Sequence, residues 1–254
     1  MTQRALVRRP GPRLSEGLVT HLQRTPVDVD LALGQWRSYV DALGAAGWTC
    51  VEVPPADDCP DAVFVEDTMV VYRDLAVMAR AGAESRRPEA AAAEEAVAAQ
   101  GYRVERIVEP GTLDGGDVLK VDSTIYVGIG GRTNAEGVEQ LRSWFEPLGA
   151  KVVGVPVTKV LHLKSAVTAL PDGTVIGYPP LVDDPSVFES FLAVPEEAGA
   201  HVVLLGDNNL LMASSAPLTA NLLSTRGYHP VLVDISEFEK LEGCVTCLSI
   251  RLRG

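Results

Sequence analysis

Residues 113–121, LDGGDVLKV, place a polar kink directly before a short apolar strand. The same order recurs in VFVEDTMVV around residue 67, HLKSAVTAL around 165, GDNNLLMA around 208 and GCVTCLSI around 245. A spacing of about 35 to 50 residues is typical of propellers and other repeat folds, although unrelated hairpins in an α/β protein give a similar rhythm. If the units close into a ring, their kinks meet on one axis. The residues brought to a common mouth would then be Glu66, Asp67, Asp114, Asp117, His162, Lys164 and Cys247.

The segments between these units favour an α/β fold without a linker. Helices are expected at 31–46, 88–100, 134–148 and 216–226, where Ser215 is suited to cap the helix and Pro217 to begin it. Gly227 would end the last of these helices. Short runs rich in β-branched residues lie between the helices and predict strands.

Composition limits the possible partners and compartment. The 254 residues are 46% hydrophobic and 22% charged, which suits one large domain or two small ones. No apolar run approaches the roughly 18 residues of a membrane span, and no signal peptide is evident, so we expect a cytoplasmic protein. The formal net charge of -12 argues against nucleic acid and anionic lipid as partners. An acidic surface can also attract a cationic small molecule, or serve solubility alone.

Cys244 and Cys247 form a C-x2-C pair whose purpose the residues alone leave open. A zinc site is disfavoured because it needs four ligands and no second such pair exists. A redox C-x-x-C usually begins a helix, whereas CVTCLSIRL is typical of a strand. On a strand, residues three apart face opposite sides, so at most one thiol would share the core face. Two alternatives remain. Either both thiols are buried core residues, or one of them is a catalytic thiolate assisted by His162 and Asp114.

Several motifs in register provide a resemblance. FVEDTMVV, RAGAESRRPE, GTLDGGDVL, GRTNAEG, VLHLKSAVT and SEFEKLEGCVTCLSIRL together resemble the dimethylarginine dimethylaminohydrolases of the guanidine-modifying superfamily. The resemblance spans nearly the whole chain. It implies an α/β fold, a five-bladed α/β propeller with pseudo-fivefold symmetry, formed by residues 1–254 as a single catalytic domain.

The resemblance also implies an activity. It is the hydrolysis of N-omega-methylated L-arginines to L-citrulline and dimethylamine or methylamine, through a covalent thiouronium on cysteine, with no metal or organic cofactor. A homodimer is possible. Alternatives are another guanidine-modifying enzyme, such as an arginine deiminase, or a non-catalytic binding module. The length of 254 residues leaves little room for the insertions of the deiminases, and the retained Cys247, His162 and Asp114 argue against a module.

Individual roles follow from the matched motifs. TCLS makes Cys247 rather than Cys244 the nucleophile, His162 of VLHLK the acid and base, and Asp114 its orienting partner. The remaining residues would contact substrate: Asp67 and Glu66 at the guanidinium, Asp61 near the amino-acid end, Arg86 and Arg132 at the carboxylate, Leu18 as a lid and Leu241 through its backbone. Arg87 is expected to point away from Arg86 on an extended segment. Cys244 differs from the small residue of many relatives, and its nearness to Cys247 leaves a redox or metal-inhibition role open.

Overall fold

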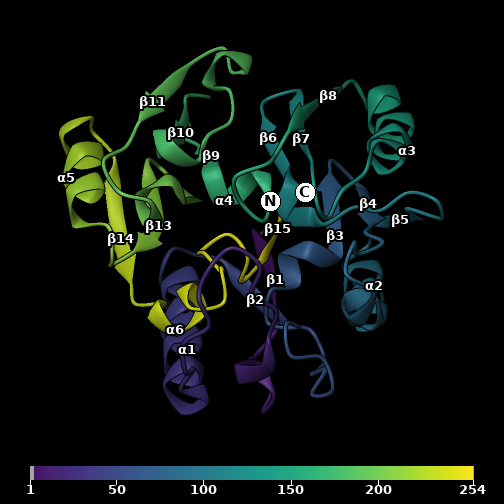
Figure 1. The fold of residues 1–254 in the computed structure, drawn as a ribbon, viewed down its shortest axis with the longest axis horizontal. Coiled ribbons are helices and arrows are strands. Elements are labelled where there is room, and N and C mark those ends of the chain that lie inside the picture. Colours follow the sequence, from purple (N-terminus) through teal and green to yellow (C-terminus); the bar gives the residue numbers. More distant parts are fainter. Residues whose placement is uncertain (1–2, 254) are drawn as a thin grey trace.

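The computed structural model describes residues 3–253, which form five three-stranded sheets around a common centre (Figure 1). In each sheet two strands pair antiparallel and a third pairs parallel with the middle strand. The predicted five-bladed α/β propeller is confirmed. The first blade holds β15 (Ile250–Leu252), β1 (Arg4–Val7) and β2 (Thr49–Glu52). The second holds β3 (Met69–Tyr72), β4 (Leu75–Met78) and β5 (Arg103–Arg106), and the third holds β6 (Val118–Val121), β7 (Thr124–Ile129) and β8 (Lys151–Pro156). The fourth holds β9 (Val167–Ala169), β10 (Val175–Gly177) and β11 (Phe191–Ala193), and the fifth holds β12 (Val203–Gly206), β13 (Asn209–Ala213) and β14 (His229–Val233).

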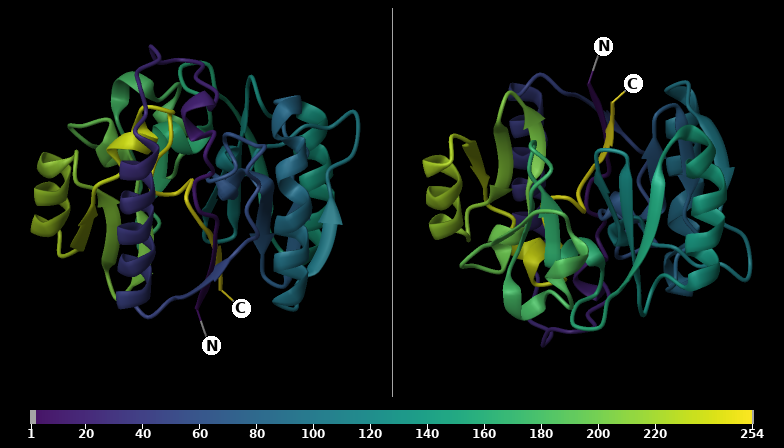
Figure 2. Two further views of the ribbon diagram at one scale, coloured as in Figure 1. Left: turned by 90° about the horizontal axis from the view of Figure 1, so that it is seen from below. Right: turned by 90° about the horizontal axis from the view of Figure 1, so that it is seen from above.

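The first blade is built from both ends of the described chain. β15 pairs antiparallel with β1, with Arg4 opposite Leu252 and Leu6 opposite Ile250. The two terminal segments therefore lie side by side, as both views in Figure 2 show. This pairing closes the ring.

Four longer helices connect the second and third strands of their blades and cover the outside of the ring (Figure 1): α1 (Val29–Ala45), α2 (Ala90–Ala99), α3 (Ala135–Phe145) and α5 (Pro217–Thr225). They agree with the four predicted helices to within a few residues. The expected cap of α5 is wrong, because Ser215 donates its hydroxyl to Glu239 and Ala216 occupies the cap position. Gly227 follows the helix with φ 87°, as expected for a helix end.

Short helical turns complete the structure. α4 (Leu163–Ala166) and α6 (Ser236–Glu239) are single α-helical turns, and 3-10 helices occupy Leu14–Glu16, Val65–Thr68, Glu84–Glu89, Gly115–Asp117, Glu146–Leu148, Pro179–Leu181, Pro185–Val187 and Ala198–Ala200. No helix among residues 3–253 has the length and apolar character needed to cross a membrane.

The polar kinks correspond to the turns that enter each blade. Val65–Thr68, Gly115–Asp117 and α4 lie directly before β3, β6 and β9, as the repeat predicted. The fourth unit was placed wrongly: GDNN joins β12 to β13, and Asp207 and Asn208 take φ of 48° and 63°. Such left-handed conformations belong to a tight hairpin turn. The kink that enters this blade is at Ala198–Ala200 instead.

The core is divided among the blades, and four of the five pack beneath a long helix. In the third blade, Leu141 and Phe145 of α3 are fully buried against Ile125 and Val127 of β7. In the blade of β9, β10 and β11 the 3-10 helices Pro179–Leu181 and Pro185–Val187 connect the second and third strands instead. The turns at the inner ends of the blades are left to form the centre of the ring. The candidate site is built there.

Candidate active site

A small cavity of about 20 Å³ lies where turns from several blades meet. All of the predicted site residues line this cavity except Asp114 and Glu66. Asp114 lies directly behind His162, within hydrogen-bond distance of its ring. The cavity is lined by Leu18, Asp61, Phe64, Asp67, Arg86, Arg132, Leu161, His162, Leu241, Glu242, Gly243 and Cys247.

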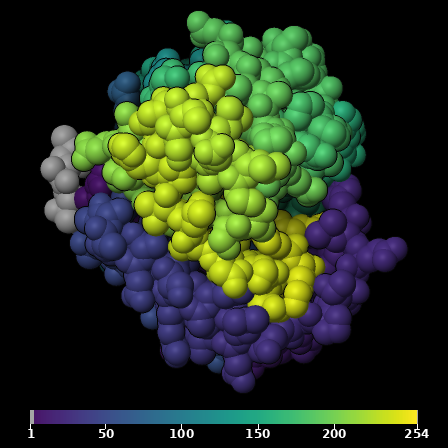
Figure 3. Space-filling view, turned by 90° about the vertical axis from the view of Figure 1, so that its left-hand side faces the viewer, coloured from purple at the N-terminus to yellow at the C-terminus, as the bar shows by residue number. Residues whose placement is uncertain are grey.

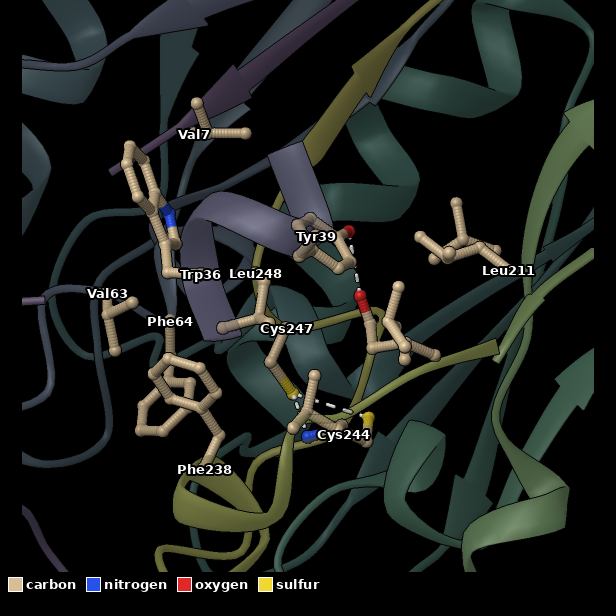
Figure 4. Packing of buried hydrophobic residues seen from close by; sticks show 14 of the residues in the cluster. Val7, Trp36, Tyr39, Val63, Phe64, Leu211, Phe238, Cys244, Cys247 and Leu248 are labelled. Atoms are coloured by element: carbon tan, nitrogen blue, oxygen red, sulfur yellow. Dashed lines mark hydrogen bonds between the residues drawn. The ribbon is translucent and has the colours of Figure 1, made fainter. Parts of the chain in front are cut away.

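Cys247 lies on a turn rather than on a strand. Residues 245–248 form the turn, and β15 begins only at Ile250, so the strand predicted for CVTCLSIRL is wrong over its first half. The Cys247 amide donates to the Cys244 carbonyl at 3.1 Å, and the Cys247 carbonyl accepts from the Glu66 amide at 3.2 Å. The buried hydroxyl of Tyr39 donates to the Val245 carbonyl (Figure 4). These bonds fix the turn from both sides.

The turn brings both thiols to the same place. The sulfurs of Cys244 and Cys247 are 3.4 Å apart and point toward one another in Figure 4, and both side chains are buried. The expectation that they face opposite sides is therefore wrong, since it rested on strand geometry. The hydrogen bond with Cys244, burial and the carboxylates of Glu66 and Asp67 all raise the pKa of Cys247. Its thiol is protonated at neutral pH.

His162 immediately precedes α4 and is 3% exposed. Its Nε2 lies 3.0 Å from a carboxylate oxygen of Asp114, and its Nδ1 is 3.9 Å from Asp67. Burial disfavours the charged imidazole, but the carboxylates of Asp67, Asp117 and Asp114 outweigh it and raise the pKa of His162 to about 9. The imidazole is thus cationic at neutral pH and holds a proton it can donate.

Glycines allow this close packing. The Gly116 amide donates to Asp67 at 2.8 Å, and a Cβ on Gly116 would lie 2.6 Å from Nδ1 of His162. The Gly82 amide donates to Asp114 at 2.9 Å. Gly116 therefore leaves out a side chain where His162 and Asp67 converge, and Gly115 does so beside the Glu66 carbonyl.

Asp117, the second acid of that motif, holds the neighbouring turns together. It accepts hydrogen bonds from the hydroxyl of Thr133 at 2.6 Å and from the amide of Leu163 at 2.9 Å. Burial raises the pKa of Asp117 to about 6, although the His162 charge opposes this. Thr133 also accepts from the Asp114 amide at 3.1 Å. Thr133 was not identified from the sequence.

Asp67 is held by a buried ion-pair network. Arg86 contacts Asp67 at 2.7 Å and Glu89 at 2.8 Å. Burial alone would favour a neutral Asp67, but His162 and Arg86 lower its pKa to about 2. All three guanidinium nitrogens of Arg86 already have hydrogen-bond partners. Glu89 was missed, and the only signal for it was its i,i+3 spacing from Arg86.

Arg86 lies in the 3-10 helix Glu84–Glu89, not on the extended segment that was expected. Arg87 nevertheless points elsewhere, since it pairs with Glu84 and is 32% exposed at its side chain.

One guanidinium nitrogen of Arg132 has no hydrogen-bond partner among residues 3–253. Its Nη1 is buried without a hydrogen-bond partner, 3.8 Å from Asp114, while Nη2 reaches Thr20 at 3.5 Å. A buried unpaired guanidinium nitrogen is costly unless something fills the gap. Nη1 of Arg132 is therefore free to donate a hydrogen bond to an acceptor in the cavity.

The segment over the cavity is tied down by two acids. Asp61 accepts from the Leu18 amide at 3.0 Å, and the Glu242 carboxylate accepts from the amides of Thr20, His21 and Leu22. Leu18 itself is 37% exposed. The segment is thus held in place beside a cavity of only about 20 Å³.

Glu66 faces away from the cavity. Its carboxylate pairs with Lys164 at 2.6 Å and with Arg251 at 2.9 Å, and it lines a separate cavity of about 460 Å³. Lys164 lines that second cavity too. The single opening predicted for the residues of the polar kinks is therefore wrong. Two cavities take its place, and Glu66 and Lys164 line the second.

Asp67, Asp114 and His162 could also hold a metal ion by distance alone, since one ligand atom of each lies within 4.8 Å of the others. Their atoms are already engaged, however, by Gly116, Gly82 and the Arg86 cation. This arrangement is held by hydrogen bonds and an ion pair of the protein itself, and it suits a metal ion less well.

Comparison with known proteins identifies the family. The sequence pattern of the family described as arginine deiminase matches residues 54–213. An N(G),N(G)-dimethylarginine dimethylaminohydrolase of Streptomyces coelicolor is 70% identical over 99% of this chain and 98% of its own. This chain belongs to the dimethylarginine dimethylaminohydrolase family.

Solved structures of dimethylarginine dimethylaminohydrolases share the fold of this family member. One, an adduct with S-methyl-L-thiocitrulline, has a TM-score of 0.92 at 32% identity and covers 99% of this chain and 100% of its own. Another, a mutant from Pseudomonas aeruginosa complexed with citrulline, has a TM-score of 0.92 at 33% identity, with the same coverage.

Proposed function

We propose that this protein hydrolyses N-omega-methylated L-arginines, asymmetric dimethylarginine and monomethylarginine, to L-citrulline and dimethylamine or methylamine. One observation carries the proposal: a single cavity is lined by a cysteine, a cationic histidine, an ionised carboxylate and an unpartnered arginine nitrogen. Its relatives bound to citrulline and to an S-methyl-L-thiocitrulline adduct support the same chemistry.

The cavity is lined by both acidic and basic side chains, which suits an arginine-like ligand. The guanidinium binds Asp67, whose low pKa keeps it ionised. The substrate carboxylate binds Nη1 of Arg132, and Asp61 lies near the amino-acid end. Arg86, expected to share the carboxylate, mainly orients Asp67 because its nitrogens are already bonded. Leu18 and Leu241 close over the substrate.

The first half of the reaction transfers the amidine carbon to sulfur. The incoming guanidinium offsets the carboxylates that keep Cys247 protonated, so the pKa of Cys247 falls and its thiol releases a proton to solvent to form the thiolate. The thiolate attacks the central guanidine carbon. His162, held cationic by Asp114, then donates its proton to the departing dimethylamine. A covalent thiouronium remains on Cys247.

The second half regenerates the thiol. His162 is now neutral and removes a proton from water, whose oxygen attacks the same carbon. The carbon–sulfur bond breaks as the added hydroxyl becomes the carbonyl of citrulline, and the hydroxyl proton passes to the Cys247 sulfur. The thiol and the protonated His162 are both restored. The residues named supply each proton, so no cofactor is required by the steps. We also propose the cytoplasm as the compartment, because free thiols are kept reduced there.

A substrate panel tests this function. Asymmetric dimethylarginine, monomethylarginine, arginine and agmatine are incubated with the protein, and citrulline and released amine are measured separately. Equal amounts of citrulline and dimethylamine from asymmetric dimethylarginine are expected. Turnover of arginine to ammonia and citrulline, with none from the methylated compounds, would instead make the protein a deiminase.

A further inference from the structure

The proposed reaction uses Cys247 and leaves Cys244 without a purpose. Cys244 is nevertheless held beside the nucleophile: the sulfurs are 3.4 Å apart, and the Cys244 amide lies 3.5 Å from the Cys247 sulfur. A disulfide bond is about 2.05 Å long, so small side-chain rotations suffice to bring the sulfurs together. The turn at 245–248 already places both residues on one side (Figure 4).

The two thiols open onto different cavities. Cys247 lines the small candidate active site, whereas Cys244 lines a neighbouring cavity of about 410 Å³. Leu161, Glu242 and Gly243 form the wall that the two cavities share. Figure 3 shows the surface where the C-terminal segment, in yellow, lies between the N-terminal part and the green segment that follows α4. A small molecule can therefore reach Cys244 without entering the active site.

The surroundings of Cys244 favour reaction with an oxidant. The hydrogen bond from Cys247 lowers the pKa of Cys244 against the effect of burial, and His201 contributes in the same direction. His201 lines the same cavity. Cys244 lines the roomier of the two cavities, about 410 Å³ against 20 Å³, so a peroxide reaches it more readily than Cys247. The lowered pKa of Cys244 acts in the same direction, since the thiolate is the form that peroxides attack. Cys247, with its sulfur 3.4 Å away, is placed to be the resolving thiol.

We propose that Cys244 is the site of a reversible oxidation by peroxides that closes a disulfide bond to Cys247. The Cys244 thiolate attacks hydrogen peroxide, becomes a sulfenic acid and releases hydroxide. The Cys247 thiol then attacks the Cys244 sulfur, the sulfur–oxygen bond breaks, and the sulfenic OH leaves with the Cys247 proton as water. The hydroxide from the first step combines with the proton that the Cys244 thiol released on ionising, which gives the second water. Two thiols and one peroxide thus give one disulfide and two waters. A dithiol reductant reverses the bond by thiol–disulfide exchange.

The bond would stop turnover, because it consumes the nucleophile. It would also protect Cys247, since a disulfide does not proceed to the irreversible sulfinic acid. The loss of activity, though not the bond itself, rests on the proposed function. Mass and activity are therefore measured separately.

The test uses the whole protein and a variant in which Cys50 and Cys59 are both replaced by serine, so that only the pair remains. Each is treated with hydrogen peroxide and analysed by intact mass and peptide mapping. A mass loss of about 2 Da that maps to a Cys244–Cys247 link, together with activity restored by dithiothreitol, is the expected result.

Cys244→Ser is the matched control. This variant keeps the backbone of the turn, so at least half of the untreated activity should remain. Peroxide should now leave an oxygen adduct on Cys247, and dithiothreitol should not fully restore the activity. Oxygen adducts on Cys247 of the wild-type protein, without a link to Cys244, would overturn the proposal. A mapped link in a protein that still turns over methylarginine would support the modification and refute the catalytic role of Cys247.

Discussion

Nε2 of His162 lies 3.0 Å from a carboxylate oxygen of Asp114, and both side chains are almost fully buried. Because both groups are buried, the carboxylate acts on the imidazole at low dielectric. Together with Asp67 and Asp117, Asp114 raises the pKa of His162, so it helps the histidine to hold its proton at neutral pH.

Asp114→Asn removes that negative charge and should lower the pKa of His162 from about 9. Carboxylates raise the pKa of a histidine by favouring its charged form, so deleting one moves the titration toward lower pH. We expect turnover to fall at least about a hundredfold, the usual scale for a lost proton donor. NMR titration of the imidazole, assigned with His162→Gly, measures the shift. Asp41→Asn, at an exposed position of α1, is the control, and an unchanged His162 titration in Asp114→Asn would refute this account.

Cys247→Ser should abolish turnover, while Cys244→Ser leaves most of it. A serine hydroxyl forms an alkoxide far less readily than a thiol forms a thiolate, so it cannot replace the nucleophile at neutral pH. A haloacetamidine, a reactive mimic of the guanidine group, should add its mass to Cys247 in the wild-type protein. Equal losses in the two serine variants would contradict the assignment of roles.

Arg132→Ala should weaken recognition of the substrate carboxylate. Wild-type protein should use a methylated agmatine, which lacks that carboxylate, at least about a hundredfold less efficiently than methylarginine, because a buried donor stays unpaired. In Arg132→Ala the difference between the two substrates should largely disappear. Values of kcat/KM for both substrates and both proteins complete the cycle. Arg87→Ala, whose side chain pairs with Glu84, should preserve the difference.

Substrate binding should draw a proton from Cys247. Its pKa is raised in the free protein by the bond to Cys244, by burial and by Glu66 and Asp67, and a bound cation offsets the carboxylates. Thiolate absorbance at about 240 nm, titrated in the Cys244→Ser background, should rise at lower pH when an unreactive cationic guanidine is added. Full thiolate absorbance at about pH 6 without the ligand would show that the nucleophile is permanently ionised.

Gly116→Ala should destabilise the protein and impair turnover. The new Cβ would lie 2.6 Å from His162 and 2.7 Å from Asp67, so these groups must shift. Overpacking of this kind costs about 1–3 kcal/mol of unfolding free energy. Thermal unfolding followed by circular dichroism measures it. Gly131→Ala is the control, since its Cβ would meet nothing within 4 Å, and similar losses in both variants would show that the close approach is unimportant.

Much of the fold was predictable, because its helices and strands carry local signals. Capping and glycine residues mark the helix ends, and β-branched runs mark the strands. The place of the hairpin turn in the fifth blade, that of β12, β13 and β14, was not predictable. GDNN is polar, as an inner kink would be, and only the left-handed φ of Asp207 and Asn208 shows that it joins β12 to β13.

The sequence predicted which residues gather at the candidate site, but not the direction in which each side chain points. Glu66 and Asp67 are neighbours in a 3-10 helix, where adjacent side chains diverge, so one faces each cavity. The pairing of Arg86 with Glu89 likewise depends on a helical turn that the sequence suggested to be extended. The approach of Cys244 to Cys247 required the turn before β15, which strand-like residues concealed.

The pairing of β15 with β1 orders events during synthesis on the ribosome. β1 is made first, but it has no antiparallel partner until β15 has been translated, so the ring stays open on the growing chain. Cys247 comes after the other proposed catalytic residues and directly before β15. The proposed nucleophile and the closing strand are therefore translated together, near the end of the chain. We expect turnover only of a chain whose ring can close.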